Sequence, residues 1–275
     1  MSVPSPKFFY LLSLHAFIVA SILYAAYLAR PVPRVLSSAR WTSLAGFVIQ
    51  TIPLLLVHLA GQAWLGGAGP FFGLLAWSVA GLYHLVRLKY EVTLLGLITA
   101  PLAALFTTLA FLTPEAPLPE LSVHLAWVEA HVLVTIAGEA LFGIAAAASA
   151  LYLLQDWRLR NKHIHAEPRL PDLETLDLLN RRLILIGAVL LTVGLGMGFA
   201  AAVALDRREI FREPLVLAFD ATWMLYVGML LVRAAGRIGG RKAALLSMVS
   251  YLLAVVALVG ANLMTIPGAR PMHGG

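Results

Sequence analysis

The chain has 275 residues, of which 60% are hydrophobic and only 12% are charged, and its mean hydropathy is +0.86. This composition excludes a soluble globular domain of this length. The net charge of +6 does not indicate a nucleic-acid partner, because the basic residues lie at the ends of apolar runs, where they anchor helices against lipid headgroups.

Apolar runs of about 20 residues predict eight transmembrane helices that form one all-α membrane domain over residues 1–275. In chain order the runs are Phe8–Ala29, Trp41–Trp64, Pro70–Leu88, Val92–Leu112, His131–Gln155, Leu183–Leu205, Leu215–Ala235 and Ala243–Ile266. No connection between them is long enough for a separate folded domain. The membrane lipid is therefore the first partner that the sequence implies.

The charges of the connections predict the orientation. Of the 20 Lys and Arg residues, 15 fall in alternate connections, which are expected to be cytoplasmic because positive residues are retained there. Both termini are then expected outside. The 15 are Arg30, Arg34, Arg40, Arg87, Lys89, Arg158, Arg160, Lys162, Arg169, Arg181, Arg182, Arg233, Arg237, Arg241 and Lys242.

Two connections carry amphipathic segments. In the outer connection Thr113–Ala130, the spacing of Val123, His124 and Trp127 predicts a short helix at the interface that leads into the fifth span. In the cytoplasmic connection Asp156–Arg182, Pro171 and Asp172 give a helix start, and Leu173, Leu176 and Leu179 form one apolar stripe. We expect a second interfacial helix there, ahead of the sixth span.

Two features of composition limit the chemistry. The chain has no Cys, which excludes a thiol relay, a thiolate metal site and a haem-attachment motif of its own. In the sixth span, Gly194 and Gly198 form a GxxxG pair, which allows another helix to approach closely.

A family resemblance begins at His131. The segments HVLVTIAGEALFGIAAAASALYLLQDWRLRNKH and RLPDLETLDLLNRRLILIGAVLLTVGLGMGFAA resemble the cytochrome c assembly family, which includes the CcsA-, ResC- and HemX-type membrane proteins. Flanking segments extend the resemblance over about residues 69–263, and LPDLETLDLLNRR is its most specific part. The resemblance implies a haem-handling membrane protein.

The chain departs from the haem-exporting members at three places. REPLV stands where those members have the end of a tryptophan-rich loop, and Leu231 stands where they have a haem-ligand His. Glu139 replaces an aromatic residue. The pattern is similar to the HemX-type branch, which lacks the tryptophan-rich loop, and it does not indicate a complete cytochrome c synthase.

The histidines have a functional and a structural interpretation. The resemblance implies that His131 and His273 are paired outer ligands of haem iron; otherwise His131 is an interfacial hydrogen-bonding residue and His273 belongs to a ragged tail. His15 and His58 lie toward the outer ends of their spans, where they either satisfy polar groups within the bundle or line one outward pocket with His131. His84, near the inner end of the third span, is expected to face headgroups.

Glu139 is an unusual residue for the middle of a span. It follows His131 by eight residues, about 12 Å along a helix, on nearly the same face. A carboxylate in the membrane is costly unless it is protonated, paired or hydrated, so it marks a candidate functional site. The alternative is a protonated Glu that is hydrogen-bonded to a neighbouring helix.

The outer connection Asp206–Pro214 contains three arginines that break the charge bias, Arg207, Arg208 and Arg212. Guanidinium groups there could clamp haem propionates through bidentate pairs. Asp206, Glu209 and Glu213 neutralise them within the same nine residues, so we expect a loop whose charges pair with one another.

Three functions remain open from the sequence. The first is a non-enzymatic haem-binding or accessory protein of cytochrome c biogenesis in the bacterial plasma membrane, in contact with other cytochrome c biogenesis or tetrapyrrole-synthesis proteins. The second is a membrane scaffold or regulator of tetrapyrrole synthesis that recruits a cytoplasmic partner and binds no haem. The third is a small-molecule transporter that uses Glu139 for proton coupling.

Overall fold

The computed structural model describes residues 5–59, 68–113, 125–162, 170–204 and 206–264, and the regular structure in these ranges is entirely helical. Eight helices are long and apolar enough to cross a membrane, which confirms the predicted all-α architecture. They are α1 (Pro6–Ala29), α2 (Pro33–Leu59), α3 (Ala68–Lys89), α4 (Gly96–Leu112), α5 (Leu125–Arg160), α6 (Leu173–Ala204), α7 (Pro214–Ala234) and α8 (Gly240–Met264), with short 3₁₀ turns η1 (Thr93–Leu95) and η2 (Arg208–Arg212).

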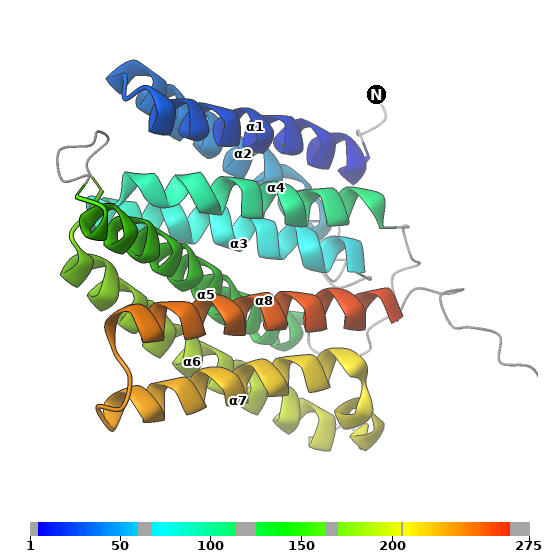
Figure 1. The fold of residues 1–275 in the computed structure, drawn as a ribbon. Helices are drawn as coiled ribbons and strands as arrows, with labels where there is room; N and C mark the ends of the chain where they lie inside the picture. Colours follow the sequence, from blue (N-terminus) through cyan, green and yellow to red (C-terminus); the bar gives the residue numbers. More distant parts are fainter. Residues whose placement is uncertain (1–4, 60–67, 114–124, 163–169, 205, 265–275) are drawn as a thin grey trace, which may run out of the picture.

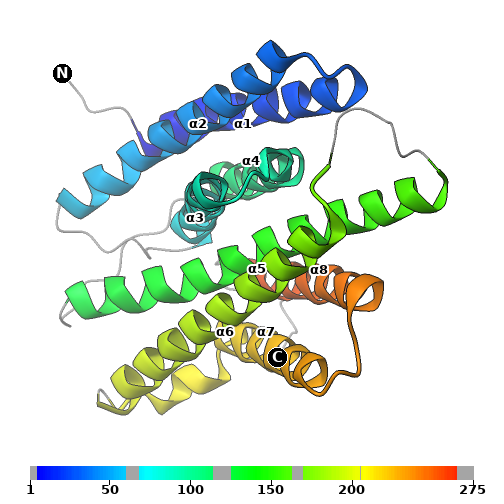
Figure 2. The same cartoon turned by 90° about the vertical axis from the view of Figure 1, so that its left-hand side faces the viewer.

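The helices form two groups that meet along α5. Helix α1 packs against α2 and α4, and α3 packs against α4, whereas α5 packs against α6 and α8, and α7 against α8 (Figure 1). The contact between α3 and α5 joins the two groups, and Figure 2 shows α5 running obliquely across the bundle between them. In the most apolar 18-residue stretch of α5, 83% of the residues are buried, so a polar side chain there cannot rely on headgroups or water.

Small residues allow α5 to occupy the centre. A Cβ atom at Gly138 would stand 2.9 Å from the carbonyl oxygen of Gly187, so the backbones of α5 and α6 touch at this point. The alanines at 145–148 of α5 are also buried. Without a hydrophobic driving force between helices in lipid, such close packing is a main source of helix association.

The start of α1 and the end of α8 lie at the same end of the bundle, as an even number of spans requires (Figure 1). The opposite end carries the turns that join α1 to α2, α3 to α4 and α7 to α8, where Arg30, Lys89 and Arg237 are exposed. The orientation in which that end is cytoplasmic stays a prediction from the charge distribution.

The predicted interfacial helix ahead of the sixth span is wrong as a separate element. Leu173 begins a continuous helix that runs to Ala204, and its start at Asp172 is confirmed, because Asp172 Oδ1 accepts a hydrogen bond of 2.6 Å from the backbone N–H of Thr175. Leu176 and Leu179 are buried within the bundle, which explains why the segment joins the span and does not lie on the membrane surface. Of the other predicted interfacial helix, Val123 and His124 lie outside the described ranges, and Trp127 belongs to α5, which begins at Leu125.

Candidate functional site

His131 lies in the second turn of α5 and is held by α6. Its Nδ1 is 2.8 Å from the backbone carbonyl oxygen of Gly194. A carbonyl oxygen only accepts, so Nδ1 carries the hydrogen and Nε2 keeps its lone pair. Among the described residues Nε2 has no hydrogen-bond partner. The ring therefore has the tautomer that a metal-binding imidazole needs.

The two glycines of the GxxxG pair form the surface on which this part of α5 rests. A Cβ atom at Gly198 would stand 2.8 Å from Cε1 of His131, and one at Gly194 would stand 3.1 Å from Cα of Thr135. Thr135 in turn donates to the backbone carbonyl of His131 at 2.8 Å. The predicted close approach of a helix at this pair is confirmed. The helix that approaches is α5, and the His131 imidazole fills the space beside Gly198.

Glu139 lies two turns further along α5 and is buried, with 1% of its surface exposed. Neither carboxyl oxygen has a hydrogen-bond partner in the described part of the chain. The hydroxyl groups of Tyr226 on α7 and Tyr251 on α8 are also buried without a partner, and both tyrosines interact electrostatically with Glu139. We call Glu139, Tyr226 and Tyr251 the Glu139 cluster.

Both tyrosines pack on the turn of α5 that follows Glu139. The ring of Tyr226 stacks on Phe142 with 3.7 Å between centroids, and a Cβ atom at Gly143 would stand 2.9 Å from Cζ of Tyr251. Helices α5, α7 and α8 thus place four oxygen atoms, unpartnered among the described residues, in the interior of the group formed by α5 to α8. Buried polar atoms are normally paired, so this arrangement favours a functional role over a purely structural one. The hydrogen bond to a neighbouring helix that the structural interpretation requires is not present among the described residues.

The other candidate histidines do not join His131 in the described structure. His15 is exposed on α1, and its Nδ1 contacts the carbonyl oxygen of Leu11 on the same helix at 2.7 Å. The side chain of His58 and the whole of His273 lie outside the described residues. The predicted pairing of His131 with His273 therefore stays a prediction.

The outer arginines pair within their own loop, as expected for Arg207 and Arg208. The Arg207 guanidinium binds the carboxylate of Glu209, and Arg208 lies 3.7 Å from Asp206. Hydrogen bonds from the Glu209 backbone N–H and from Arg207 lower the pKa of Glu209 below its usual value. Both pairs are exposed, and they leave these two guanidinium groups less available to a haem propionate.

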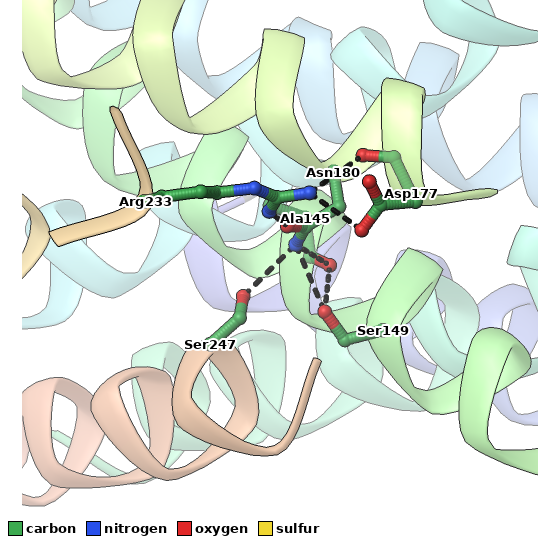
Figure 3. A network of polar contacts seen from close by, with 6 residues as sticks. All are labelled: Ala145, Ser149, Asp177, Asn180, Arg233 and Ser247. Carbon is green, nitrogen blue, oxygen red and sulfur yellow. Dashed lines mark hydrogen bonds and ion pairs between the residues drawn. The ribbon is translucent and has the colours of Figure 1, made fainter. Parts of the chain in front are cut away.

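A polar network that no sequence pattern indicated lies at the other end of α5. Asn180 Nδ2 on α6 lies within 3.0 Å of the Ala145 carbonyl oxygen, Ser149 Oγ and Ser247 Oγ (Figure 3). Arg233 on α7 donates to Asn180 Oδ1 at 2.9 Å and pairs with Asp177 at 2.5 Å. The network joins α5, α6, α7 and α8. Asp177 and Asn180 belong to the LPDLETLDLLNRR segment, whereas Arg233 is notable in the sequence only for its positive charge at the end of a span.

Comparison with known proteins agrees with this architecture. The family model described as cytochrome C assembly protein matches residues 68–267, which include α3 to α8. The chain belongs to the cytochrome c assembly protein family. The resemblance expected over residues 69–263 is thus confirmed, and α1 and α2 precede the matched region.

A curated relative adds no assigned function. An Azospirillum brasilense protein, described as an uncharacterized 28.8 kDa protein in the nifR3-like 5' region, is 29% identical over 161 residues. The alignment spans 58% of this chain and 59% of the relative, which is less than two thirds of the relative's length. No solved structure matches the chain.

Proposed function

We propose that the chain is a haem-handling accessory protein of cytochrome c biogenesis, of the HemX-like type, in the bacterial plasma membrane. In this proposal His131 is an axial ligand of haem iron at the end of the bundle that the charges predict to be outer. The chain acts by binding haem and by contacting other proteins of cytochrome c biogenesis or tetrapyrrole synthesis, without covalent chemistry of its own. Family membership supports the general role in cytochrome c biogenesis.

The observation that carries the proposal is the hydrogen bond from His131 Nδ1 to the Gly194 carbonyl oxygen. A histidine that binds a metal commonly donates its other ring N–H to a backbone carbonyl, which fixes the tautomer and the ring orientation. Gly198, one turn further along α6, packs directly against the ring, because there is no room between them for even a Cβ atom. His131 is thus arranged to present Nε2, and haem would gain an iron–imidazole bond there.

Two features support an accessory role over a complete synthase. The chain has no Cys, and Leu231, which stands at the family's haem-ligand position, is 66% exposed on the outward side of α7. A side chain at that position points toward lipid in this fold, away from the other helices. The resemblance implies His273 as the second ligand of the outer site, and the proposal retains it.

An absorbance spectrum of the full chain, purified in mild detergent and supplied with haem, tests the proposal. We expect a Soret band and a low-spin reduced spectrum. His131→Gly should lose haem or shift the spectrum, and added imidazole should partly restore it by occupying the vacated coordination position. Ala130→Gly is the matched control, since it introduces the same helix-weakening residue beside the site and should leave the spectrum unchanged.

The same preparation separates the alternatives. If the wild-type protein takes up no haem, the scaffold or regulator function becomes the better explanation. The Glu139 cluster favours proton-coupled transport as a second candidate, because a carboxyl group without a partner is suited to exchange a proton or to hold a polar ligand. That function predicts that Glu139→Gln abolishes uptake in proteoliposomes but leaves the haem spectrum unchanged.

The proposed location of the haem site also depends on orientation. A tag at either terminus should be accessible from outside, and a tag inserted at Arg160 should be protected in sealed right-side-out vesicles. A protected C-terminus in this protease experiment would place His131 on the opposite side of the membrane.

A further inference from the structure

A cavity of about 470 Å³ lies between α2, α3 and α5, away from the His131 site and from the Glu139 cluster. Its walls are apolar over most of their length and include Leu44, Phe47, Trp77, Leu82, Leu133 and Ala137. Trp77 stacks on Phe47 at 5.4 Å and donates its indole N–H to Thr51 at 2.8 Å. The aromatic wall is therefore fixed in place, and its one polar group is already satisfied.

The cavity opens sideways toward the lipid. Leu85 and Leu88 line it, and 61% and 77% of their surfaces are exposed on the outside of the bundle. In Figure 2, α2 and α5 flank α3 on this side of the molecule. An apolar molecule in the bilayer can thus enter without crossing a polar barrier. The volume falls within the roughly 300–1,000 Å³ that is usual for small-molecule sites.

Arg87 at one end of the cavity, and Arg40 near it on α2, lack a negative partner among the described residues. Arg87 lines the cavity, and Arg40 lies one turn before Leu44 on the same face of α2. Among the described residues no carboxylate lies within 4 Å of either guanidinium, and the Nε atom of each is buried without a hydrogen-bond partner. Guanidinium groups stay charged, so this end of the cavity is an anion site with no anion supplied by the described protein.

His84 lines the same cavity and lies near both arginines. The expectation that it faces headgroups is wrong: only 8% of its surface is exposed, because α2 covers it and Ser43 Oγ lies 3.4 Å from its Nε2. Both arginines interact electrostatically with this ring. Its Nδ1 is buried and Nε2 faces Ser43, so neither ring nitrogen is presented to the cavity as an iron ligand.

We propose that this cavity binds one acidic phospholipid from the leaflet that the charges predict to be cytoplasmic. One acyl chain lies along Phe47, Trp77 and Leu133, and the headgroup phosphate lies between Arg40 and Arg87. The apolar walls match the acyl chain, and the two arginines match the phosphate of the headgroup. The lateral opening gives the lipid access from the bilayer. The arginines set the preference for an anionic headgroup, and the aromatic wall holds the chain. The site is independent of the haem proposal.

Native mass spectrometry of the full chain, released from maltoside micelles that contain dioleoyl phosphatidylglycerol or dioleoyl phosphatidylcholine, tests this site. We expect retention of one phosphatidylglycerol and little phosphatidylcholine. Each arginine near a phosphate contributes about fivefold in affinity, so Arg40→Gln combined with Arg87→Gln should weaken phosphatidylglycerol binding on the order of 20-fold. Arg34→Gln is the matched control, because Arg34 is exposed near the start of α2, whereas the Nε atom of Arg40 is buried.

The apolar part of the site needs its own variant. Ala137→Phe places a ring in the cavity from α5, and we expect it to displace the bound lipid while both arginines stay in place. Three results would each overturn the proposal. They are equal retention of the two lipids, equal losses of lipid binding in the Arg34 control and the double variant, and full lipid binding by the Ala137 variant. Displacement of the lipid by added haem, with a Soret band lost in His84→Gly, would overturn it in favour of a second haem site.

Discussion

The Asn180 network and the Glu139 cluster both lie among α5 to α8, but they differ in whether their buried polar atoms have hydrogen-bond partners. The Asn180 network, at the end predicted to be cytoplasmic, pairs the side-chain amide of Asn180 and ties four helices together (Figure 3). The Glu139 cluster leaves four oxygen atoms without partners among the described residues. Both use α5, α7 and α8, so the difference does not come from which helices take part. A satisfied network stabilises a fold, whereas an unsatisfied one lowers stability and is retained for another reason.

The largest expected effect is on the satisfied network. Asn180→Leu removes the hydrogen bonds to Ala145, Ser149, Ser247 and Arg233, and leaves the guanidinium with Asp177 alone. Interhelical hydrogen bonds in membranes contribute about 0.6 kcal/mol each on average, so we expect a loss of about 2 kcal/mol. Thermal unfolding in detergent should show a midpoint several degrees lower.

Asn161→Leu provides the control for this change. Asn161 is exposed just after the end of α5, and among the described residues its side chain donates only to the backbone carbonyl of Trp157. Its replacement should leave the midpoint within error. Equal midpoints for Asn180→Leu and the wild type would mean that the network does not hold the four helices.

The Glu139 cluster should respond in the opposite direction. Glu139→Leu removes a buried carboxyl group that has no described partner, and we expect stability to rise by about 1 kcal/mol. Glu139→Gln should leave expression and unfolding unchanged while function, measured as mature cytochrome c in a complemented deletion strain, falls. A loss of stability in the Leu variant would place Glu139 in the same structural class as Asn180.

His131 lies between these two cases, because Nδ1 is hydrogen-bonded and Nε2 has no hydrogen-bond partner among the described residues. Its surroundings can be changed by substitutions on α6. Gly198→Ala puts a methyl group 2.8 Å from the imidazole, so it should shift the haem spectrum and lower stability by about 1 kcal/mol. Gly196→Ala is the matched control, since nothing lies within 4 Å of its Cβ position. It should keep the spectrum and raise stability slightly, as expected for Gly to Ala in a helix.

The smallest effect concerns the cap of the helix that carries Asn180. Hydrogen bonds from the backbone N–H and the hydroxyl of Thr175 lower the pKa of Asp172. Asp172→Ala should lower the free energy of unfolding by about 0.5–1 kcal/mol near pH 7, because an N-cap is lost. A carboxyl group whose pKa is lowered in the folded state stabilises that state at pH values above its unfolded pKa. The difference between variant and wild type should therefore shrink as the pH falls below about 4 and through the lowered folded value.

Thermal unfolding across that pH range checks the prediction. A difference that stays constant down to pH 2 would show that the carboxylate is not the stabilising group. The cap is exposed, so its contribution should also vary little with added detergent.

The sequence by itself determined the number of spans, their approximate bounds and a helix start at Asp172, because apolar length and capping residues act locally. It also singled out His131 and Glu139, since a polar residue in an apolar run is unusual in any fold. It did not distinguish a separate interfacial helix from the first turns of a long one. That distinction depends on whether Leu176 and Leu179 meet lipid headgroups or other helices.

Only the tertiary structure decided which polar groups are paired. The distances from Asn180 to Ser247 and Arg233 join residues 67 and 53 positions away, and no local pattern encodes them. The same holds for the Gly194 carbonyl that fixes the His131 tautomer and for the two arginines brought together by α2 and α3. Hydrophobicity places a helix in the membrane, but its rotation and its neighbours are set by packing, and these determine whether a buried polar atom has a partner.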